Sequence, residues 1–346
     1  MLKLPKNAKV VEKFKYVLIL FVAVVIAGIV FGVVRVANND TFLNFGIDFT
    51  GGATIQITAD EQMSEDNQKK LTEFIEKDGY RVNGQIQETN ASEGYIYELR
   101  LSYERYGKTI TDEVGFMKEI FESGNDKDLC GRLLTYANDD LHLGLGEDSV
   151  KAYAVGQTAS DSLIKSAIWA IVVAIAVMLI YIVIRFTFSS ALAAVCALAH
   201  DVIVMIALMS IFNITINSTF IAAVITIIGY SINATIVIFD RVRAKLKLTT
   251  SAELTNTQIA NESIMSTLTV TVLSTLTTLI MVVFLVILSV TDIQEFILPI
   301  IFGLVAGAVS STMVAPALWV QFRKIGKKAK TNKKAVSGGV ARKENS

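Results

Sequence analysis

Long apolar runs with almost no charge constrain this chain more than any other feature of its sequence. A hydrocarbon core about 30 Å thick needs roughly 20 consecutive apolar residues in a helix. Hydrophobic residues make up 52% of the 346 residues, and they are gathered into blocks of that length. We therefore predict an α-helical membrane protein with six transmembrane helices, at about 16–37, 163–184, 188–212, 217–239, 267–290 and 296–320.

The first apolar run follows a basic leader, as a secretory signal peptide would. The run is too long for that class of segment, and "VVRVANND" at its end offers no small-residue cleavage site. We expect a retained membrane anchor.

Charge is distributed unevenly although the formal net charge is +0. Residues 38–161 hold 24 Asp and Glu against 11 Lys and Arg. The first 16 residues hold five lysines and one acid, Glu12, and the segment after Trp319 holds nine Lys and Arg and one acid, Glu344. Basic residues favour the cytoplasmic side of a membrane, so we expect both termini inside and the acidic stretch outside.

These expectations divide the chain into five parts. We predict cytoplasmic segments at 1–15 and 321–346, a first helix at 16–37, an extracytoplasmic domain at 38–161 and a five-helix bundle at 162–320. The basic tail is expected to enforce topology and attract anionic headgroups of the lipid membrane, and no nucleic acid is expected to bind it.

The acidic stretch predicts a small α+β domain. "GATIQITAD" alternates as a half-buried strand, and a helix is expected from Ser64 to Gly79. Two strands follow in "RVNGQIQET" and "YIYELRLSY", joined by a turn at Gly94, then a helix opening near Thr111 and a strand in "DSVKAYAVG". The order βαββαβ indicates a ferredoxin-like domain.

The residues that catalysis or metal binding would need are sparse. The only cysteines, Cys130 and Cys196, fall in different predicted parts, and the only histidines are His142 and His200. No metal-ligand spacing and no nucleophile–base pair is present. We expect no enzyme, no metal and no cofactor.

Two ionisable residues, His200 and Asp201, lie near the middle of the third predicted span, in "ALAHDVIVM". Neighbouring residues point about 100° apart on a helix, so the two side chains need not contact each other. Intramembrane ionisable residues are functional candidates, and histidine titrates near neutral pH. Two interpretations stay open, which are a structural network between helices and a proton relay or gating site.

The fourth predicted span contains "IIGYSINATIVIFDR", with Tyr230, Ser231 and Asn233 at a depth without water. Polar side chains there often hydrogen-bond to a neighbouring helix, so we expect these three to form an intramembrane bridge. Asp240 and Arg241 mark the expected cytoplasmic end of this helix.

Four stretches together resemble the SecD/SecF family, the accessory membrane subunits of the bacterial Sec protein-export machinery. They are "FGIDFTGGATIQI", "RFTFSSALAAVCALAHDV", "IIGYSINATIVIFDRVR" and "NESIMSTLTVTVLSTLTTL", and the resemblance covers about residues 10–320. A single six-span unit with a short outside domain is similar to the SecF pattern rather than to SecD.

The resemblance implies a half-bundle of the RND type in the bacterial cell membrane, paired with a SecD-like subunit beside the SecYEG channel. It implies assistance to the export of unfolded preprotein clients, coupled to the proton gradient. The alternative is a non-conducting scaffold subunit, with ion coupling carried by SecD.

Three positions depart from the family pattern. The family has an acid where this chain has Ala234 and an arginine where it has Val270, and these two charges are the ones assigned to proton movement. Alanine and valine cannot titrate, so that role is not carried over. Gln157 stands where a proline is usual, which predicts a softer junction into the second span.

The junctions on either side of the outside domain are rich in glycine. We expect Asp48, Gly51, Gly52 and Gly156 to form a hinge or junction, because glycine permits backbone shapes that other residues resist and a neighbouring acid can cap a turn. A purely structural turn is an equally open interpretation.

Overall fold

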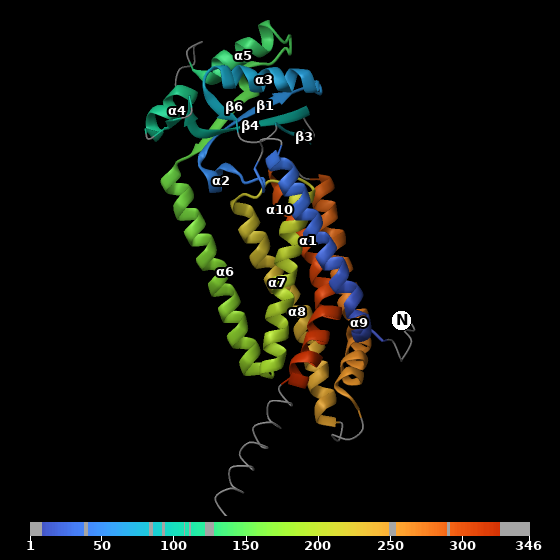
Figure 1. Ribbon diagram of the computed structural model, residues 1–346. Coiled ribbons are helices and arrows are strands. Elements are labelled where there is room, and N and C mark those ends of the chain that lie inside the picture. The colour runs from blue at the N-terminus through green and yellow to red at the C-terminus, as the bar shows by residue number, and fades with distance from the viewer. Residues whose placement is uncertain are drawn as a thin grey trace, which may run out of the picture.

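A computed structural model of the chain describes residues 9–37, 41–82, 86–91, 94–106, 108–110, 112–121, 128–248, 254–288 and 291–325. Long helices form a bundle, and an α+β domain sits on one end of it (Figure 1). The predicted basic tail falls mostly outside the described residues, as does the beginning of the predicted N-terminal segment.

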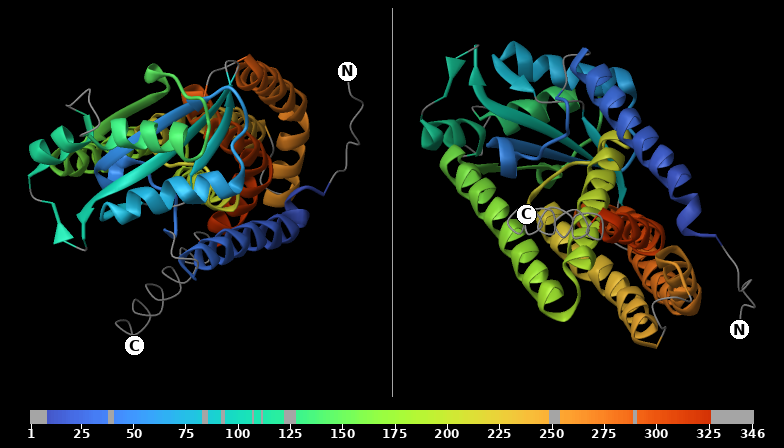
Figure 2. Two further views of the ribbon diagram at one scale, coloured as in Figure 1. Left: turned by 90° about the horizontal axis from the view of Figure 1, so that it is seen from above. Right: turned by 60° about the horizontal axis from the view of Figure 1, so that its bottom comes forward.

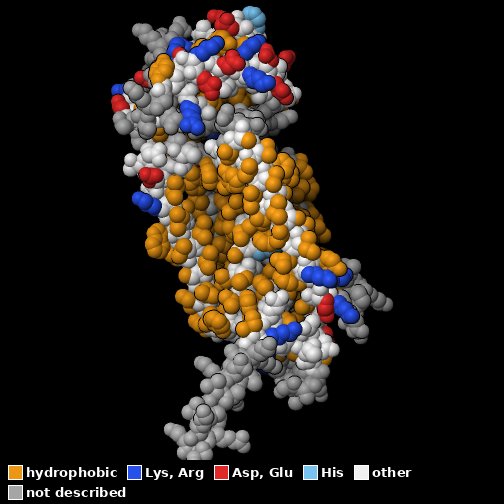
Figure 3. Space-filling view, viewed as in Figure 1, with side chains coloured by type: hydrophobic (Ala, Val, Ile, Leu, Met, Phe, Trp, Pro, Cys, Tyr) orange, Lys and Arg blue, Asp and Glu red, His pale blue; other side chains and the backbone are white. Residues whose placement is uncertain are grey.

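Six helical segments in the described residues are long and apolar enough to cross a membrane, which confirms the predicted fold class. An apolar band covers the visible side of the bundle, and charged side chains lie beyond both of its ends (Figure 3). The helices are α1 (Phe14–Ala37), α6 (Gln157–Arg185), α7 (Phe188–Ile211), α8 (Ser218–Leu248), α9 (Asn256–Leu288) and α10 (Thr291–Val309), and the helix of α10 continues to residue 325.

The helices α8 and α9 extend past the predicted limits at 239 and 267. Their polar ends pair with each other and with α6, through Lys245 and Glu262 and through Arg185 and Asp240. Hydropathy missed these turns because charged side chains lower the hydropathy of a segment without ending its helix.

The centre of the bundle consists of α7, α8 and α10, while α6 and α9 lie at its two edges (Figures 1 and 2). Gly303 and Gly307 let α10 approach closely. A Cβ at Gly303 would collide with Ile227 of α8, and one at Gly307 would lie 3.2 Å from Ser231 Cβ.

A π-helical turn, Ser310–Val314, interrupts the last helix just before Pro316. Proline has no N–H to donate to the carbonyl four residues earlier, and its ring would clash with that carbonyl. A wider turn at this place accommodates both effects, because π-helical hydrogen bonds span five residues.

The α+β domain contains an antiparallel sheet in the order β2–β4–β1–β6, with β3 and β5 also paired to β4. Helices α3, α4 and α5 pack against one face of this sheet, and the short α2 lies on the side of the bundle (Figure 1). This is the predicted ferredoxin-like arrangement. The elements are α2 (Ile47–Thr50), β1 (Gly52–Ala59), α3 (Glu65–Lys77), β2 (Tyr80–Val82), β3 (Gln87–Ala91), β4 (Gly94–Arg105), β5 (Lys108–Thr109), α4 (Glu113–Phe121), α5 (Leu129–Asp139) and β6 (Val150–Val155).

Helix α5 is an addition that the βαββαβ pattern did not predict. Asp128 caps it by accepting a hydrogen bond from Gly131 N at 2.8 Å, and Leu129 and Leu133, one turn apart, are buried in the domain core. An N-cap acid followed by apolar residues at helical spacing was a signal for this helix.

Candidate functional site

Asp201 lies at the centre of the bundle on α7 and is fully buried. Its Oδ2 accepts hydrogen bonds from Ser231 Oγ of α8 at 2.6 Å and from Ser310 Oγ of the π-helical turn at 2.8 Å. One carboxylate oxygen therefore joins three helices. No lysine or arginine pairs with Asp201 within the described part of the chain.

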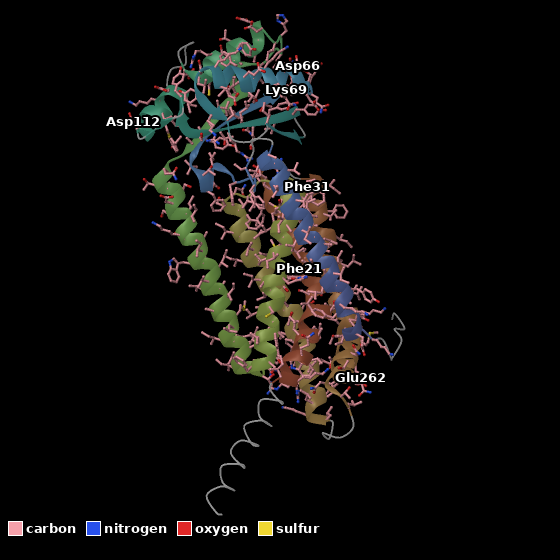
Figure 4. The ribbon with its side chains drawn as sticks, viewed as in Figure 1. Phe21, Phe31, Asp66, Lys69, Asp112 and Glu262 are labelled. Atoms are coloured by element: carbon pink, nitrogen blue, oxygen red, sulfur yellow. The ribbon has the colours of Figure 1, made fainter. Side chains whose placement is uncertain are left out.

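His200 contacts Asp201, with 3.1 Å between Nδ1 and Oδ1, although neighbouring helical residues need not meet. Its ring packs against Phe21 of α1, with 4.6 Å between the ring centroids. Phe21 lies about a third of the way along α1 from its N-terminal end (Figure 4). The imidazole is 11% exposed, so it stands between the buried carboxylate and the outer side of the bundle.

A groove of about 270 Å³ borders the imidazole on that outer side, between α1, α7 and the end of the last helix. Apart from His200 and the Cys196 thiol, its lining is apolar. The lining residues are Phe14, Val17, Leu18, Phe21, Cys196, Ala199, His200, Ile203, Val314 and Leu318.

Tyr230, Ser231 and Asn233, the three polar residues of α8 that were predicted to form a bridge, have three different environments. Ser231 reaches Asp201, whereas the buried Tyr230 hydroxyl forms no hydrogen bond with any described residue. Asn233 is exposed, and the bridge expected from it is not made to any described residue. Two residues of helix turn Asn233 about 200° away from Ser231, which faces the bundle centre.

The two uncharged replacements lie toward the outside of the bundle. Val270 is 63% exposed on α9, and Ala234 is half-buried on α8, next to the exposed Asn233. The surfaces that carry Asn233 and Val270 are therefore open to a neighbouring subunit or to lipid.

A second polar cluster joins the α+β domain to the bundle. The segment before α2 lies against the loop between α7 and α8. Gly46 N donates to Ile216 O at 2.9 Å, Ile216 N donates to Asn44 O at 2.7 Å, and Phe45 pairs with Ile216 as a short parallel bridge.

Arg100 of β4 reaches across this junction and is only 6% exposed. Its guanidinium donates to Asn44 Oδ1 and, at 2.6 Å, to Thr215 Oγ1 of the same loop. Glu98 Oε2 lies 3.7 Å from it. The sheet of the domain is thus bound to the loop between α7 and α8 by a buried cation.

Arg35 of α1 binds the same loop from below the domain. It donates to Asn213 Oδ1 at 2.6 Å and to Ser210 Oγ at 2.8 Å. The loop is therefore fixed by one arginine from the domain and one from the bundle.

Asp48, Gly51 and Gly52 lie within this junction. Asp48 Oδ2 accepts a hydrogen bond from Ser218 N at 2.9 Å and so caps α8. Gly51 and Gly52 have φ values of +66° and +122°, and a Cβ at Gly52 would overlap the carbonyl oxygen of Leu101. Glycine is required at position 52 for both reasons.

Gly156 and Gln157 mark the start of α6. Gly156 has φ −64° and ψ 149°, an extended conformation that any residue adopts. Gln157 is the first helical residue, where proline is readily accepted, and α6 begins there without one.

Asp240 and Arg241 connect α8 to its neighbours at the end of the bundle away from the α+β domain. Asp240 Oδ1 lies 2.8 Å from Arg185 Nη2 of α6, and Arg241 Nε donates to Ser266 Oγ of α9 at 3.2 Å. These contacts are exposed. Glu262, labelled in Figure 4, lies at the same end.

Sequence analysis did not single out Ser310 or Arg100. A serine pair shortly before a proline in an apolar span was the available signal for Ser310. Arg100 was marked only by a charge in the middle of an otherwise alternating strand, because its partner Thr215 lies 115 residues further along the chain.

Two family models match the chain, and between them they contain the Asp201 cluster and part of the junction. The model described as the SecD/SecF GG motif matches residues 43–63, in the junction. The model described as protein export membrane protein SecD/SecF, C-terminal, matches residues 143–325, more than half of the chain and including Asp201. The chain belongs to the SecD/SecF family.

Similar proteins of the SecD/SecF family differ in length. Protein translocase subunit SecF of Sebaldella termitidis is 32% identical over 293 residues, which are 84% of this chain and 85% of that protein. Protein translocase subunit SecDF of Bacillus subtilis is 33% identical over 315 residues, 90% of this chain but 38% of that protein. This chain thus spans little more than a third of the SecDF relative and most of the SecF one.

The solved structure of SecDF from Thermus thermophilus, a translocon-associated membrane protein, shares the fold. It matches with a TM-score of 0.68 at 27% identity, over 91% of this chain and 38% of that chain. This chain, with six candidate spans in its described residues, is a SecF-like member of the family.

Proposed function

We propose that this chain pairs with a SecD-like subunit in the bacterial cell membrane and assists the export of unfolded preproteins beside the SecYEG channel. The SecDF relatives support the pairing, because each continues well beyond the part that this chain matches. The exposed apolar sides of α6 and α9 offer surfaces for that second subunit. The proposed orientation puts the α+β domain outside and the lysine-rich start of the chain in the cytoplasm.

We further propose that Asp201 and His200 form the protonation-sensitive element of this subunit. The observation that supports this is a fully buried carboxylate shared by three helices and bordered by an imidazole on the groove side. Charge-assisted hydrogen bonds are about twice as strong as neutral ones. Protonation of Asp201 would therefore weaken the contact of α7 with α8 and with the last helix. A proton that reaches Asp201 past His200 would in this way change the packing of the bundle.

One observation favours a second candidate function, the non-conducting scaffold. Ala234 and Val270 remove both charges that the family pattern places on α8 and α9. Replacing both members of a buried ion pair by apolar residues is often neutral for stability. In this case Asp201 only clamps the helices, and SecD carries the ion coupling.

Export of a reporter preprotein in cells that carry Asp201→Asn separates the two candidates. Co-purification of the SecD-like subunit is the assembly control, and Asp240→Asn, at an exposed helix end, is the matched substitution. Ion coupling through Asp201 predicts that export falls while assembly survives, and that His200→Phe has the same effect. Unchanged export with intact assembly would contradict it and support the scaffold.

A further inference from the structure

We propose that the groove beside His200 binds an anionic phospholipid, with an acyl chain in the groove and the headgroup at the basic ends of α1 and the last helix. This inference does not depend on ion coupling or on a partner subunit. It assigns a ligand to a cavity that the proposed function leaves unused.

The chemistry of the groove fits a hydrocarbon chain. A buried water needs two to four polar partners, and the groove offers one imidazole and one thiol, at His200 and Cys196. The groove lies on the outer side of a helix bundle whose surface is apolar, where acyl chains are the abundant apolar ligand (Figure 3).

The groove also runs in the direction that a lipid would take. Its α1 wall extends from Phe14, the first residue of the helix, to Phe21, about a third of the way along it (Figure 4). Seven residues of helix cover about 10 Å, which is the length of roughly eight methylene groups. A chain that enters at the lower end of α1 would therefore reach the imidazole of His200.

Charge at the lower end of the groove is complementary to an anionic headgroup. Lys13 and Lys15 flank Phe14, and Lys15 lies one turn before the lining residue Leu18, on the same side of α1. Arg323 and Lys324 lie beyond Leu318, at the end of the last helix. None of these four basic groups forms an ion pair with a described residue.

Arg323 packs on Trp319, which is not a lining residue of the groove. Its guanidinium lies over the Trp319 ring, 5.3 Å from the centroid, and it is half-buried there. The acid nearest in sequence to the lysines, Glu12, accepts a hydrogen bond from Asn261 Nδ2 at 2.9 Å. Basic groups near a membrane surface attract anionic lipids, so a phosphate with net negative charge is favoured here over a zwitterionic headgroup.

Native mass spectrometry of the full-length chain in detergent, with phosphatidylglycerol or phosphatidylcholine of identical acyl chains, tests the proposal. We expect phosphatidylglycerol to be retained in preference, and Lys15→Gln with Arg323→Gln to lower its affinity by about tenfold or more. Lys247→Gln, an exposed lysine at the same end on α8, is the control and should change little. Equal retention of the two lipids would overturn the proposal.

A groove-filling variant tests the acyl chain separately from the headgroup. Ala199 is exposed at the groove and Leu192 lies two turns earlier on the same side of α7, so both accept tryptophan at the surface. Ala199→Trp should reduce retained phosphatidylglycerol, and Leu192→Trp should not. Equal amounts of retained phosphatidylglycerol in the two variants would show that the headgroup binds without an acyl chain in the groove. That result would overturn the proposal.

Cys196 provides a readout in a bilayer. In full-length chain carrying Cys130→Ala, the rate of Cys196 alkylation by N-ethylmaleimide is measured in vesicles of phosphatidylcholine alone and with added phosphatidylglycerol. Slower alkylation with phosphatidylglycerol supports the site. Protection that needs the SecD-like subunit and ignores lipid composition would show that a protein segment fills the groove, and would contradict the proposal.

Discussion

The Asp201 cluster and the Arg100 junction are both buried and polar, but they are built around opposite charges. Asp201 accepts from two serine hydroxyls within the bundle, whereas Arg100 donates to an amide and a hydroxyl between the bundle and the domain. A carboxylate can be neutralised by a proton, while an arginine stays charged at any physiological pH. The proton response proposed for Asp201 therefore has no counterpart at the junction, where the cation keeps its bonds throughout.

The largest effect is expected at the junction, from Gly52→Ala. The added Cβ would overlap the Leu101 carbonyl in a backbone conformation that alanine resists, so we expect a loss of about 3 kcal/mol or more in the free energy of unfolding of the domain. Gly144→Ala is the control, because Gly144 also has a positive φ but has no atom within 4 Å of the added Cβ. Thermal unfolding in detergent measures both, and equal losses would contradict the close packing at Gly52.

A smaller effect is expected at the bundle centre. Asp201→Ala leaves the Ser231 and Ser310 hydroxyls without their shared acceptor and should lower the free energy of unfolding by about 2 kcal/mol. Asp201→Asn keeps an acceptor oxygen and should cost less. The melting temperature of the purified chain compares them. If alanine proved as stable as asparagine, the carboxylate would not be the clamp between the three helices.

Removal of Arg100 should loosen the junction without affecting the bundle. Arg100→Met removes the guanidinium that donates to Asn44 and Thr215, and we expect local opening to become easier by about 1–2 kcal/mol. Hydrogen exchange in the loop at 212–217 should rise while exchange at the centre of α7 stays constant. Faster exchange throughout α7 would show that the two clusters are coupled and would break the contrast between them.

The smallest effect on stability concerns Cys130 of the domain. Burial, with a further contribution from Asp128, raises the pKa of this thiol to about 12. Both folded and unfolded states hold the proton at pH 8, so stability does not depend on pH there. Above about pH 9 the unfolded thiol ionises first, and the free energy of unfolding falls as the pH rises toward 12.

Alkylation kinetics check this pKa. A shift from 9.0 to about 12 leaves roughly a thousandth of the usual thiolate at pH 8, so Cys130 should react only when the domain is unfolded. The measurement uses chain carrying Cys196→Ala, with and without denaturant. Alkylation of folded chain at the denatured rate would place the thiol at the surface.

The sequence predicts those features of the fold that are determined by the residues within a single helix or strand. Six apolar windows predict six spans because the solvent for each helix is the same hydrocarbon. Strand and helix order in the domain follow from local alternation and capping, as at Ser64, which accepts a hydrogen bond from Asn67 N. The ends of α8 and α9 were missed because ion pairs between the two helices, and not hydropathy, stabilise them.

The candidate site is less predictable because it is made between elements. A charged residue in an apolar segment identifies Asp201 as a candidate. It does not identify the residues of other helices that hydrogen-bond to Asp201. Ser310 reaches it only through the geometry of the π-helical turn, and Asn233 faces away although it is as polar as Ser231. The side of a helix that faces its neighbours depends on how all the helices pack, and that information is not local.

The π-helical turn at Ser310–Val314 is the place where the winding of the last helix departs from that of an α-helix. A π-turn carries one residue more than an α-turn, and tightening it would rotate one half of the helix relative to the other by about 100°. Gly303 would remain seated against α8 on one side of this turn. On the other side Ser310 would swing out of reach of Asp201, so a change of a single residue in the winding of one helix would open the connection among three.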